Sequence, residues 1–288
     1  MESHNNQKKI AVINDLTGFG RCALTVAIPV ISVMGLACCP VPTSILSNHT
    51  AFPSCFIDDY TDKMEPYINE WKKLGLVFDG IYSGFLGSRE QIAIVKRFFQ
   101  SFRKADTQII IDPVMGDNGK PYRTYTVDMC QAMKELVCYG SIVTPNVTEA
   151  CILTDTPYKE QWSEAQLEAL ARKLVLMGPK KVVITGVEMP DGSIGNYCLE
   201  QPAGALSEQP AGRLLTIERA GKSRCGTGDL FASIIAADAV NGVALEASVR
   251  KAAAFVAKTI RAPEAEEIPL TDGVCFEYFL SELAPERV

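Results

Sequence analysis

The sequence predicts an α/β protein with one doubly wound, mostly parallel β-sheet covered by helices on both faces. Short continuous apolar runs recur along the chain, most are followed by an amphipathic stretch, and polar or small residues stand where the runs end. Continuous apolar runs are typical of parallel strands that are buried on both faces. With 288 residues, 47% of them hydrophobic and 22% charged, the chain can bury a large core.

The predicted elements alternate between strands and helices. The predicted strands are, in order, 10–13, 80–83, 109–111, 141–144 and 181–185, with a hairpin or paired edge strands over 193–218. The predicted helices are 22–34, 89–103 and most of 230–283, the last broken at Pro263 and Pro269. Residues 1–8 are polar and are expected to form a disordered tail. No internal repeat or linker divides 9–288, so we expect a single domain there.

The composition argues against several classes of protein. A formal net charge of -6 and a pI near 5.2, without any Lys/Arg-rich run, argue against a partner made of nucleic acid. No apolar run approaches the length that spans a bilayer, so no membrane association is expected. The ten cysteines include no C-x-x-C pair and there are only two histidines, which leaves little for a zinc site. In a chain of this size the cysteines indicate thiols of a reducing compartment such as the cytoplasm.

The glycines after the first predicted strand match a dinucleotide-binding fingerprint only in part. Gly18-x-Gly20-x-x-Ala23 has the spacing, but the acid that would hold a ribose about 20 residues later is missing. The Walker pattern G-x-x-x-x-G-K-[ST] and the hydrolase elbow G-x-S-x-G are both absent. A nicotinamide oxidoreductase, a Walker-type nucleotide site and a serine hydrolase therefore lack support.

The segment Arg224–Leu230 carries the strongest chemical signal in the chain. Gly226 and Gly228 flank a threonine, Asp229 follows, and a helix-forming run begins at once. The free N–H groups at a helix start bind anions, and an acid at the edge of such a site suits a base beside a phosphoryl group. The turn by itself is equally compatible with an ordinary loop in which Asp229 caps the helix.

Two further acids stand near predicted strand ends. Asp112 follows the strand 109–111, and Glu149 lies three residues past Asn146 at an expected helix start. Ligands of doubly wound sheets bind at the carboxyl ends of the strands, so these acids and the 224–230 turn are expected at one site. Phosphoryl transfer from ATP needs carboxylates that hold Mg²⁺ directly or through water, backbone donors for the phosphoryl group, and a base for the accepting alcohol. The sequence therefore favours a kinase.

These residues belong to a series of motifs that resembles the ribokinase superfamily and, within it, the pyridoxal (pyridoxine, pyridoxamine) kinases. The resemblance extends from Ile10 to about Ile260. Its markers are, in order, Ser47-Asn48-His49-Thr50, Ser83-Gly84-Phe85-Leu86-Gly87-Ser88, Asp112-Pro113-Val114-Met115-Gly116-Asp117, Thr144-Pro145-Asn146, Val183-Ile184-Thr185 and Gly226-Thr227-Gly228-Asp229-Leu230-Phe231. The resemblance implies a ribokinase-like fold and phosphorylation of the 5′-hydroxymethyl group of vitamin B6 by ATP, with Mg²⁺ and a monovalent cation (K⁺ or Na⁺). It also implies a cytoplasmic homodimer.

The resemblance further implies a role for each residue of the site. Asp229 would be the catalytic base, and the anion hole would consist of Gly226, Thr227 and Gly228. The Mg-ATP and monovalent-cation region would contain Asp112, Thr144, Glu149 and Thr185. The nucleotide would be contacted by Asp117, Asn146, Gly186 and Thr227, and by Tyr122 in a loop over the phosphates. The vitamin pocket beside Asp229 would contain Asn14, Thr50 and Ser83.

Departures from the family pattern leave the substrate open. Asn14-Asp15 replaces the Ser-x-His-type residues that commonly follow the first strand, and Gly186 replaces a common serine. The nearest alternative is a hydroxymethylpyrimidine (phosphate) kinase of thiamine synthesis, although those enzymes typically carry Gly-Thr-Gly-Cys where this chain has Asp229. Cys225 has two interpretations: a thiolate that adds to the aldehyde of pyridoxal, or a small packing residue beside the nucleotide. The intact acids argue against a non-catalytic vitamin-binding protein of the same fold.

Overall fold

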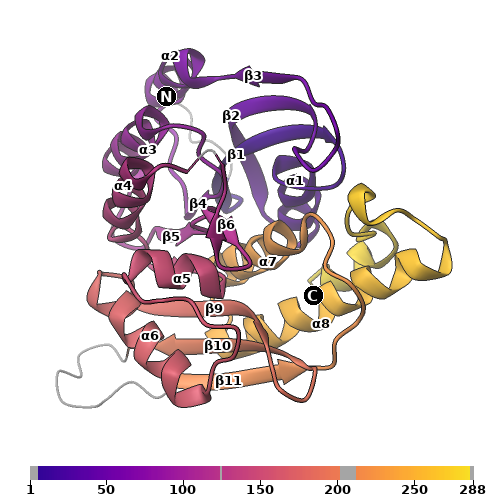
Figure 1. The fold of residues 1–288 in the computed structure, drawn as a ribbon. Coiled ribbons are helices and arrows are strands. Elements are labelled where there is room, and N and C mark those ends of the chain that lie inside the picture. The colour runs from indigo at the N-terminus through magenta and orange to yellow at the C-terminus, as the bar shows by residue number, and fades with distance from the viewer. Residues whose placement is uncertain (1–5, 124, 202–211, 286–288) are drawn as a thin grey trace.

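The computed structural model describes residues 6–123, 125–201 and 212–285. A nine-stranded sheet runs through the middle of the molecule, and helices cover both of its faces (Figure 1). In spatial order its strands are β11 (Gly212–Ile217), β10 (Ile194–Glu200), β9 (Lys181–Glu188), β8 (Ile142–Val143), β5 (Gln108–Ile111), β4 (Gly80–Ser83), β1 (Lys9–Phe19), β2 (Ala37–Asn48) and β3 (Ile57–Asp59). The strands from β9 to β2 in this order run parallel, whereas β10, β11 and β3 are antiparallel to their neighbours. The predicted doubly wound α/β fold is confirmed.

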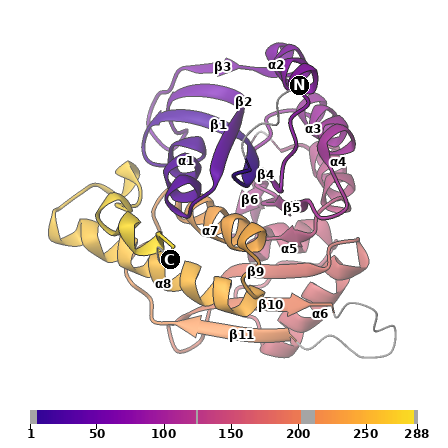
Figure 2. The ribbon, with the colours of Figure 1, turned by 180° about the vertical axis from the view of Figure 1, so that it is seen from behind.

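The helices form a layer on each face of the sheet. One layer contains α2 (Thr61–Leu74), α3 (Arg89–Phe102), α4 (Val127–Val137), α5 (Val147–Leu153) and α6 (Glu164–Leu176). The other contains α1 (Leu24–Val33), α7 (Thr227–Asn241), α8 (Leu245–Ala265) and the short 3₁₀ turns η1 (Leu270–Asp272) and η2 (Glu277–Leu283). Figure 2, the view from behind, has α1, α7 and α8 in front of the sheet. A small separate ribbon of β6 (Gly116–Asp117) and β7 (Lys120–Pro121) follows β5.

The alternation of side chains along β1 shows how the sheet divides the core. Ile10 and Val12 pack with residues of α1, α7 and α8, whereas Ala11 and Ile13 pack with residues of α2 to α6. Successive side chains of a strand point to opposite faces, so a strand that is covered on both sides is apolar at every position. This is why continuous apolar runs in the sequence located the parallel strands.

The predicted end of the first strand is wrong. β1 continues from Ile13 to Phe19, paired with the twelve-residue β2. Its ladder with β4 stops at Ile13, and a bulge between Asn14 and Leu16 interrupts the pairing with β2. A bulge bends a strand and redirects its side chains. The polar residues that resembled a strand end therefore mark a bulge beside the site.

The predicted break of the last helix at Pro263 is also wrong. α8 continues to Ala265, although proline cannot donate the usual hydrogen bond to the carbonyl group four residues earlier. That carbonyl group belongs to Thr259, and it accepts the N–H of Cys275 at 3.3 Å instead. A contact from a distant segment thus satisfies the group that the proline leaves free.

The predicted hairpin over 193–218 is confirmed by the antiparallel pairing of β10 with β11. Its connection, residues 202–211, lies outside the described residues, as do residues 1–5 of the predicted disordered tail. Gln7 and Lys8 hydrogen-bond to carbonyl oxygens of the folded body. The single-domain organisation of 9–288 stays a prediction. No helix in the described ranges is long and apolar enough to cross a membrane.

Candidate active site

Residues at the carboxyl ends of the parallel strands lie side by side at one edge of the sheet. Backbone hydrogen bonds join them in a row: Gly84 N–H to Ile13 O (2.9 Å), Asp112 N–H to Ser83 O (2.9 Å), Thr144 N–H to Ile111 O (3.1 Å) and Thr185 N–H to Pro145 O (2.9 Å). These bonds extend the strand ladders at their carboxyl ends. Residues from distant parts of the sequence thereby meet where a doubly wound sheet binds its ligands.

The turn before α7 keeps a space open. Gly226 has a φ of 85°, and a Cβ there would collide with the backbone oxygen of Arg21, so the position requires glycine. A Cβ at Gly228 would meet nothing closer than Asp112 Oδ2 at 4.0 Å. The Thr227 hydroxyl donates to a carbonyl oxygen within the turn (3.2 Å). The N–H groups in the first turn of α7 have no partner inside the helix and can therefore bind an anion in this space.

Asp229 lies in the first turn of α7 and is half-buried. Its Oδ1 accepts a 3.1 Å hydrogen bond from Asn14 Nδ2, and the carboxylate also accepts the N–H of Ala23. Burial raises the pKa of Asp229 above its usual value, and these two donors oppose the rise. A carboxylate with a raised pKa beside an anion-binding turn is suited to accept a proton from an alcohol.

Three more carboxylates predicted for or found at the site are almost fully buried: Asp15, Asp112 and Glu149. Burial and the charge of Asp229 raise the pKa of Asp112 to about 7. Burial raises the pKa of Asp15 to about 6, against a hydrogen bond from the Thr17 hydroxyl that lowers it. Burial and the charge of Asp112 raise the pKa of Glu149 well above its usual value. The site therefore gathers four acids whose ionised forms are unfavourable until a cation is bound.

These four carboxylates have no counter-charge within the part of the chain that the structure describes. No ion pair there joins any of them to Lys, Arg or His. Nor do three or more His, Cys, Asp or Glu side chains of the described ranges gather at one point where they could hold a metal ion. Mg²⁺ in kinases needs only one or two carboxylates, because waters and phosphate oxygens complete its shell. Asp112, with the Thr144 hydroxyl donating to its Oδ1 at 3.2 Å, fits a magnesium ion that arrives with a nucleotide.

Glu149 has a structural task as well. Its Oε2 accepts the N–H of Asn146 (2.9 Å) and Asn146 Oδ1 accepts the N–H of Glu149 (3.0 Å), which forms a capping box at the start of α5. Its Oε1 accepts the N–H of Met115 (3.1 Å), and Asn146 Nδ2 donates to Gly116 O (2.8 Å). The pair therefore joins the start of α5 to the loop that follows β5. A role of Glu149 toward Mg²⁺ stays a prediction.

The other residues predicted to contact nucleotide lie along β6 to β9. Asn146 and Thr185 form an isolated parallel bridge. Gly186 has a φ of 67° and no atom within 4 Å of the Cβ it lacks, so its backbone is open to a ligand. Asp117 ends β6 with an exposed side chain, and Tyr122, just past β7, is 44% exposed. Of these residues, Asn146 and Thr185 are thus joined directly, whereas Asp117 and Tyr122 lie on the loop that follows β5.

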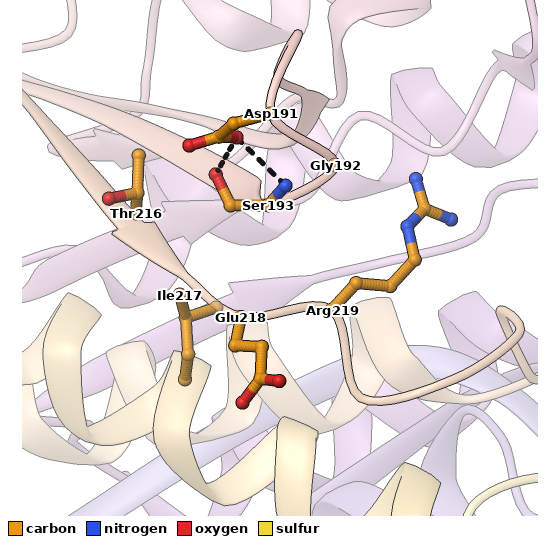
Figure 3. Close-up of a pocket in the computed structure, with 7 residues that line it drawn as sticks. All are labelled: Asp191, Gly192, Ser193, Thr216, Ile217, Glu218 and Arg219. Atoms are coloured by element: carbon orange, nitrogen blue, oxygen red, sulfur yellow. Dashed lines mark hydrogen bonds between the residues drawn. The ribbon is translucent and has the colours of Figure 1, made fainter.

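A hollow of about 430 Å³ lies further along the same edge of the sheet. It is lined by residues 191–193 on the loop before β10 and by residues 216–219 at the end of β11 (Figure 3). Asp191 accepts hydrogen bonds from the N–H and the hydroxyl of Ser193, which closes the loop into a tight turn (Figure 3). The strand register places this hollow just beyond Gly186 on β9.

The residues predicted for the substrate pocket differ in their surroundings. Asn14 is fully buried, and its Oδ1 accepts two backbone N–H groups (2.9 and 3.0 Å) while its Nδ2 holds Asp229. These contacts fix the Asn14 side chain, which in turn orients Asp229. The buried Ser83 hydroxyl has no partner among the described residues and can receive one from a ligand. Thr50 is exposed in the turn after β2.

Two residues near Asp229 escaped the sequence analysis as site candidates. One is Asp15, which follows Asn14 at the end of an apolar run, a signal that was available in the sequence. The other is Cys22, whose thiol lies near the Cys225 thiol, which raises the pKa of Cys22. No spacing pattern could have paired these two cysteines, because they approach each other only through the fold.

Known proteins provide an independent comparison. A family model described as phosphomethylpyrimidine kinase matches residues 74–273. The chain belongs to the phosphomethylpyrimidine kinase family. The matched range contains Asp112, Glu149 and the turn at 226–229.

Individual members of this kinase family and its relatives match over most of the chain. Two crystal forms of a candidate phosphomethylpyrimidine kinase from Bacteroides thetaiotaomicron are 37% identical, with TM-scores of 0.91 and 0.89 and coverage of 98% or more of each chain; the second form contains pyridoxal. A pyridoxal kinase from Lactobacillus plantarum is 25% identical, with a TM-score of 0.86 and 97% of each chain covered. A pyridoxine/pyridoxal/pyridoxamine kinase from Bordetella avium is 29% identical over 248 residues, 84% of this chain and 81% of the relative. The resemblance to pyridoxal kinases and the ribokinase-like fold are confirmed.

Proposed function

We propose that the protein transfers the γ-phosphoryl group of ATP to the 5′-hydroxymethyl group of pyridoxal, pyridoxamine or pyridoxine, a step of vitamin B6 salvage. The observation that carries the proposal is the position of Asp229, held by Asn14 beside the open turn at Gly228, with Asp112 across that space. This arrangement combines a proton acceptor, an anion site and a metal-binding carboxylate. The pyridoxal bound to the Bacteroides protein, and the names of the Bordetella and Lactobacillus relatives, support a B6 substrate.

Each residue of the site has its own role in the proposed reaction. Asp229 accepts the proton of the 5′-hydroxyl group as that oxygen attacks the γ-phosphorus in line, and Asn14 keeps the carboxylate oriented. The N–H groups of Gly226, Thr227 and Gly228 hold the negative charge of the transferred phosphoryl group. When bound with ATP, Mg²⁺ supplies positive charge that offsets the phosphates and the acids of the site. Burial of the acids makes this compensation stronger than it would be in water.

The remaining assignments are part of the same proposal. Mg²⁺ is held at Asp112 and Thr144 and through water at Glu149, with a monovalent cation, K⁺ or Na⁺, near Thr185. The nucleotide is contacted by Asp117, Tyr122, Asn146, Gly186 and Thr227, with its base toward the hollow beyond β9. The vitamin is contacted by Asn14, Thr50 and Ser83. The protein acts in the cytoplasm, a reducing compartment that suits its ten free cysteines. It acts there as a homodimer.

An ATP-consumption assay tests the proposal. Purified protein is assayed with pyridoxal, pyridoxamine, pyridoxine and hydroxymethylpyrimidine, each with Mg²⁺ and with the metal removed by a chelator. We expect at least one B6 vitamer to stimulate ADP formation strongly, and the chelator to abolish it. Absence of stimulation by every compound would exclude the kinase assignment. The product is identified by mass as the vitamer plus one phosphate group.

The alternative is a hydroxymethylpyrimidine (phosphate) kinase. The description of the matching family and of the Bacteroides relative favours it. Asp229 stands against it, because the resembling pyrimidine kinases typically carry cysteine at that place in the turn. A kcat/KM for hydroxymethylpyrimidine above that for every B6 vitamer would replace the first assignment by this one.

A further inference from the structure

Two cysteines that are far apart in the sequence meet beside the turn that precedes α7. Cys22 lies in the loop between β1 and α1, and Cys225 directly precedes Gly226. The Cys225 thiol lies near enough to the Cys22 thiol to raise the pKa of Cys22. Cys22 is 7% exposed, whereas Cys225 is only half-buried and can be reached by small solutes. Phosphoryl transfer as proposed above assigns no task to this pair.

The backbone around the pair holds the sulfur atoms together. A Cβ at Gly226 would collide with the Arg21 carbonyl oxygen, so the two segments touch at residues adjacent to both cysteines. Arg21 and Ala23, on either side of Cys22, have φ values of 45° and 52°. Such angles are unfavourable for residues other than glycine and persist only where surrounding contacts maintain them. The packed backbone therefore holds the two cysteines close to each other.

The pair also lies between the segment that holds Asp229 and the turn that precedes α7. The residue after Cys22 is Ala23, whose N–H donates to the Asp229 carboxylate. The residue after Cys225 is Gly226, the start of the anion-binding turn. A bond between the two sulfur atoms would displace the base and the anion turn relative to each other.

We propose that Cys22 and Cys225 form a reversible disulfide that switches the kinase off when a hydroperoxide such as hydrogen peroxide is present. The sulfur of Cys225 attacks one peroxide oxygen and the O–O bond breaks, which leaves a sulfenic acid, while the departing hydroxide takes up the thiol proton as water. The Cys22 sulfur then displaces the sulfenic hydroxyl group, which leaves with the second thiol proton as water. The two thiols lose two electrons, and one peroxide is reduced to two waters.

The surroundings set the order of these steps. Contact with Cys225, burial and the charges of Asp229 and Asp15 all raise the pKa of the Cys22 thiol. Cys22 therefore stays protonated and inert toward peroxide while Cys225 is reduced. The more exposed Cys225 reacts first, and the contact between the two sulfurs then favours the disulfide over further oxidation.

Peptide mapping of the native protein tests the proposal directly. After treatment with hydrogen peroxide and alkylation of the remaining thiols, we expect a cross-linked peptide pair containing Cys22 and Cys225 that dithiothreitol separates. Turnover should fall about a hundredfold, the size of effect that follows from moving a catalytic group by about 1 Å, and should return with dithiothreitol. Inactivated protein without this cross-link would overturn the proposal.

Two serine variants sharpen the test. In Cys22→Ser, Cys225 lacks its partner, so excess peroxide should drive it to sulfinic acid and dithiothreitol should no longer restore turnover. Cys198→Ser, at a cysteine of matching burial (6% exposed) in β10, should behave as the native protein. Full recovery of Cys22→Ser would contradict the proposal. Mapping does not use the kinase reaction, so its outcome is independent of the vitamin assignment, and it applies even if a variant fails to fold.

Discussion

Helix α7 carries two aspartates whose surroundings differ. Asp238, near its carboxyl end, is 1% exposed, and its Oδ1 lies 2.7 Å from Lys251 Nζ on α8. Asp229, in its first turn, is half-buried, accepts hydrogen bonds from neutral donors, and has no basic partner within the described ranges. The helix dipole favours an acid at the first position and disfavours one at the second. Asp238, which the dipole disfavours, is thus paired with the Lys251 cation. Asp229, where we expect a ligand, has no such cation.

This difference distinguishes an acid that stabilises the fold from an acid that serves the proposed reaction. A buried acid that only stabilises the fold is normally paired, because an unpaired buried charge is costly. For the acids at the carboxyl edge of the sheet, burial and, to a smaller extent, the charge of a neighbouring acid instead raise the pKa. Ionisation of these acids is unfavourable until a cation is present, and Mg²⁺ bound with ATP can supply that positive charge. Four substitutions or conditions test this contrast.

The largest effect is expected for Asp229→Asn. Turnover should fall about 1,000-fold, the contribution typical of a general base, while ATP binding stays nearly unchanged because the amide keeps the shape of the side chain. The free energy of unfolding should not fall, since an uncompensated carboxylate is removed. Steady-state kinetics, nucleotide titration and urea unfolding measure the three quantities. Retained turnover would remove Asp229 from the role of base.

The next effect is a dependence of stability on pH. Asp15 and Asp112 have folded pKa values of about 6 and about 7, above their usual 3.8. At pH values between 3.8 and about 7, the folded state binds more protons than the unfolded state. The free energy of unfolding of the ligand-free protein should therefore fall as pH rises from 4 to 7. Asp15 alone accounts for about 3 kcal/mol of that fall.

Urea unfolding at a series of pH values checks this dependence. Asp15→Asn should flatten the decline between pH 4 and 6, whereas Asp106→Asn, at an exposed acid, should leave it as in the native protein. A native protein whose stability rises over that range would contradict the raised pKa values. Mg²⁺ with ATP should reduce the decline, because the ligand stabilises the ionised acids.

Asp238→Asn should show the opposite pattern to Asp229→Asn. It removes the 2.7 Å ion pair with Lys251, so the free energy of unfolding should fall by about 2 kcal/mol. Turnover should be that of the native enzyme, because Asp238 lies at the far end of α7 from the site. Urea unfolding and steady-state kinetics on the same preparation separate the two effects. A large loss of turnover with native stability would break the contrast.

The smallest effect is expected for Asn14→Ala. Loss of the 3.1 Å hydrogen bond to Asp229 leaves the base less well oriented, which should lower turnover about tenfold, equivalent to one hydrogen bond of ordinary strength. Asn241→Ala removes an amide that donates to the Met34 carbonyl oxygen at the other end of α7 and serves as the matched control. Equal turnover in the two variants would show that Asn14 does not position the base.

Much of the fold could be predicted because it depends on local patterns. The strand over 80–83 and the helix after it agree with the structure almost to the residue, since apolar periodicity and the Ser88 cap act within a few residues. The extent of β1 could not be predicted in the same way. Its second half is a strand because β2 pairs with it, and Asn14 and Asp15 would otherwise favour a turn.

The sequence by itself determined the parallel sheet, the glycine turn at 226–228 and the placement of Asp112 and Asp229 at strand or helix ends. These depend on periodicity and backbone preferences, which short segments carry. Only the tertiary structure decided that Asn14 holds Asp229, that Glu149 joins two loops through backbone N–H groups, and that Cys22 meets Cys225. Contacts between residues distant in sequence, and the burial that shifts a pKa, arise only when the packed chain excludes water.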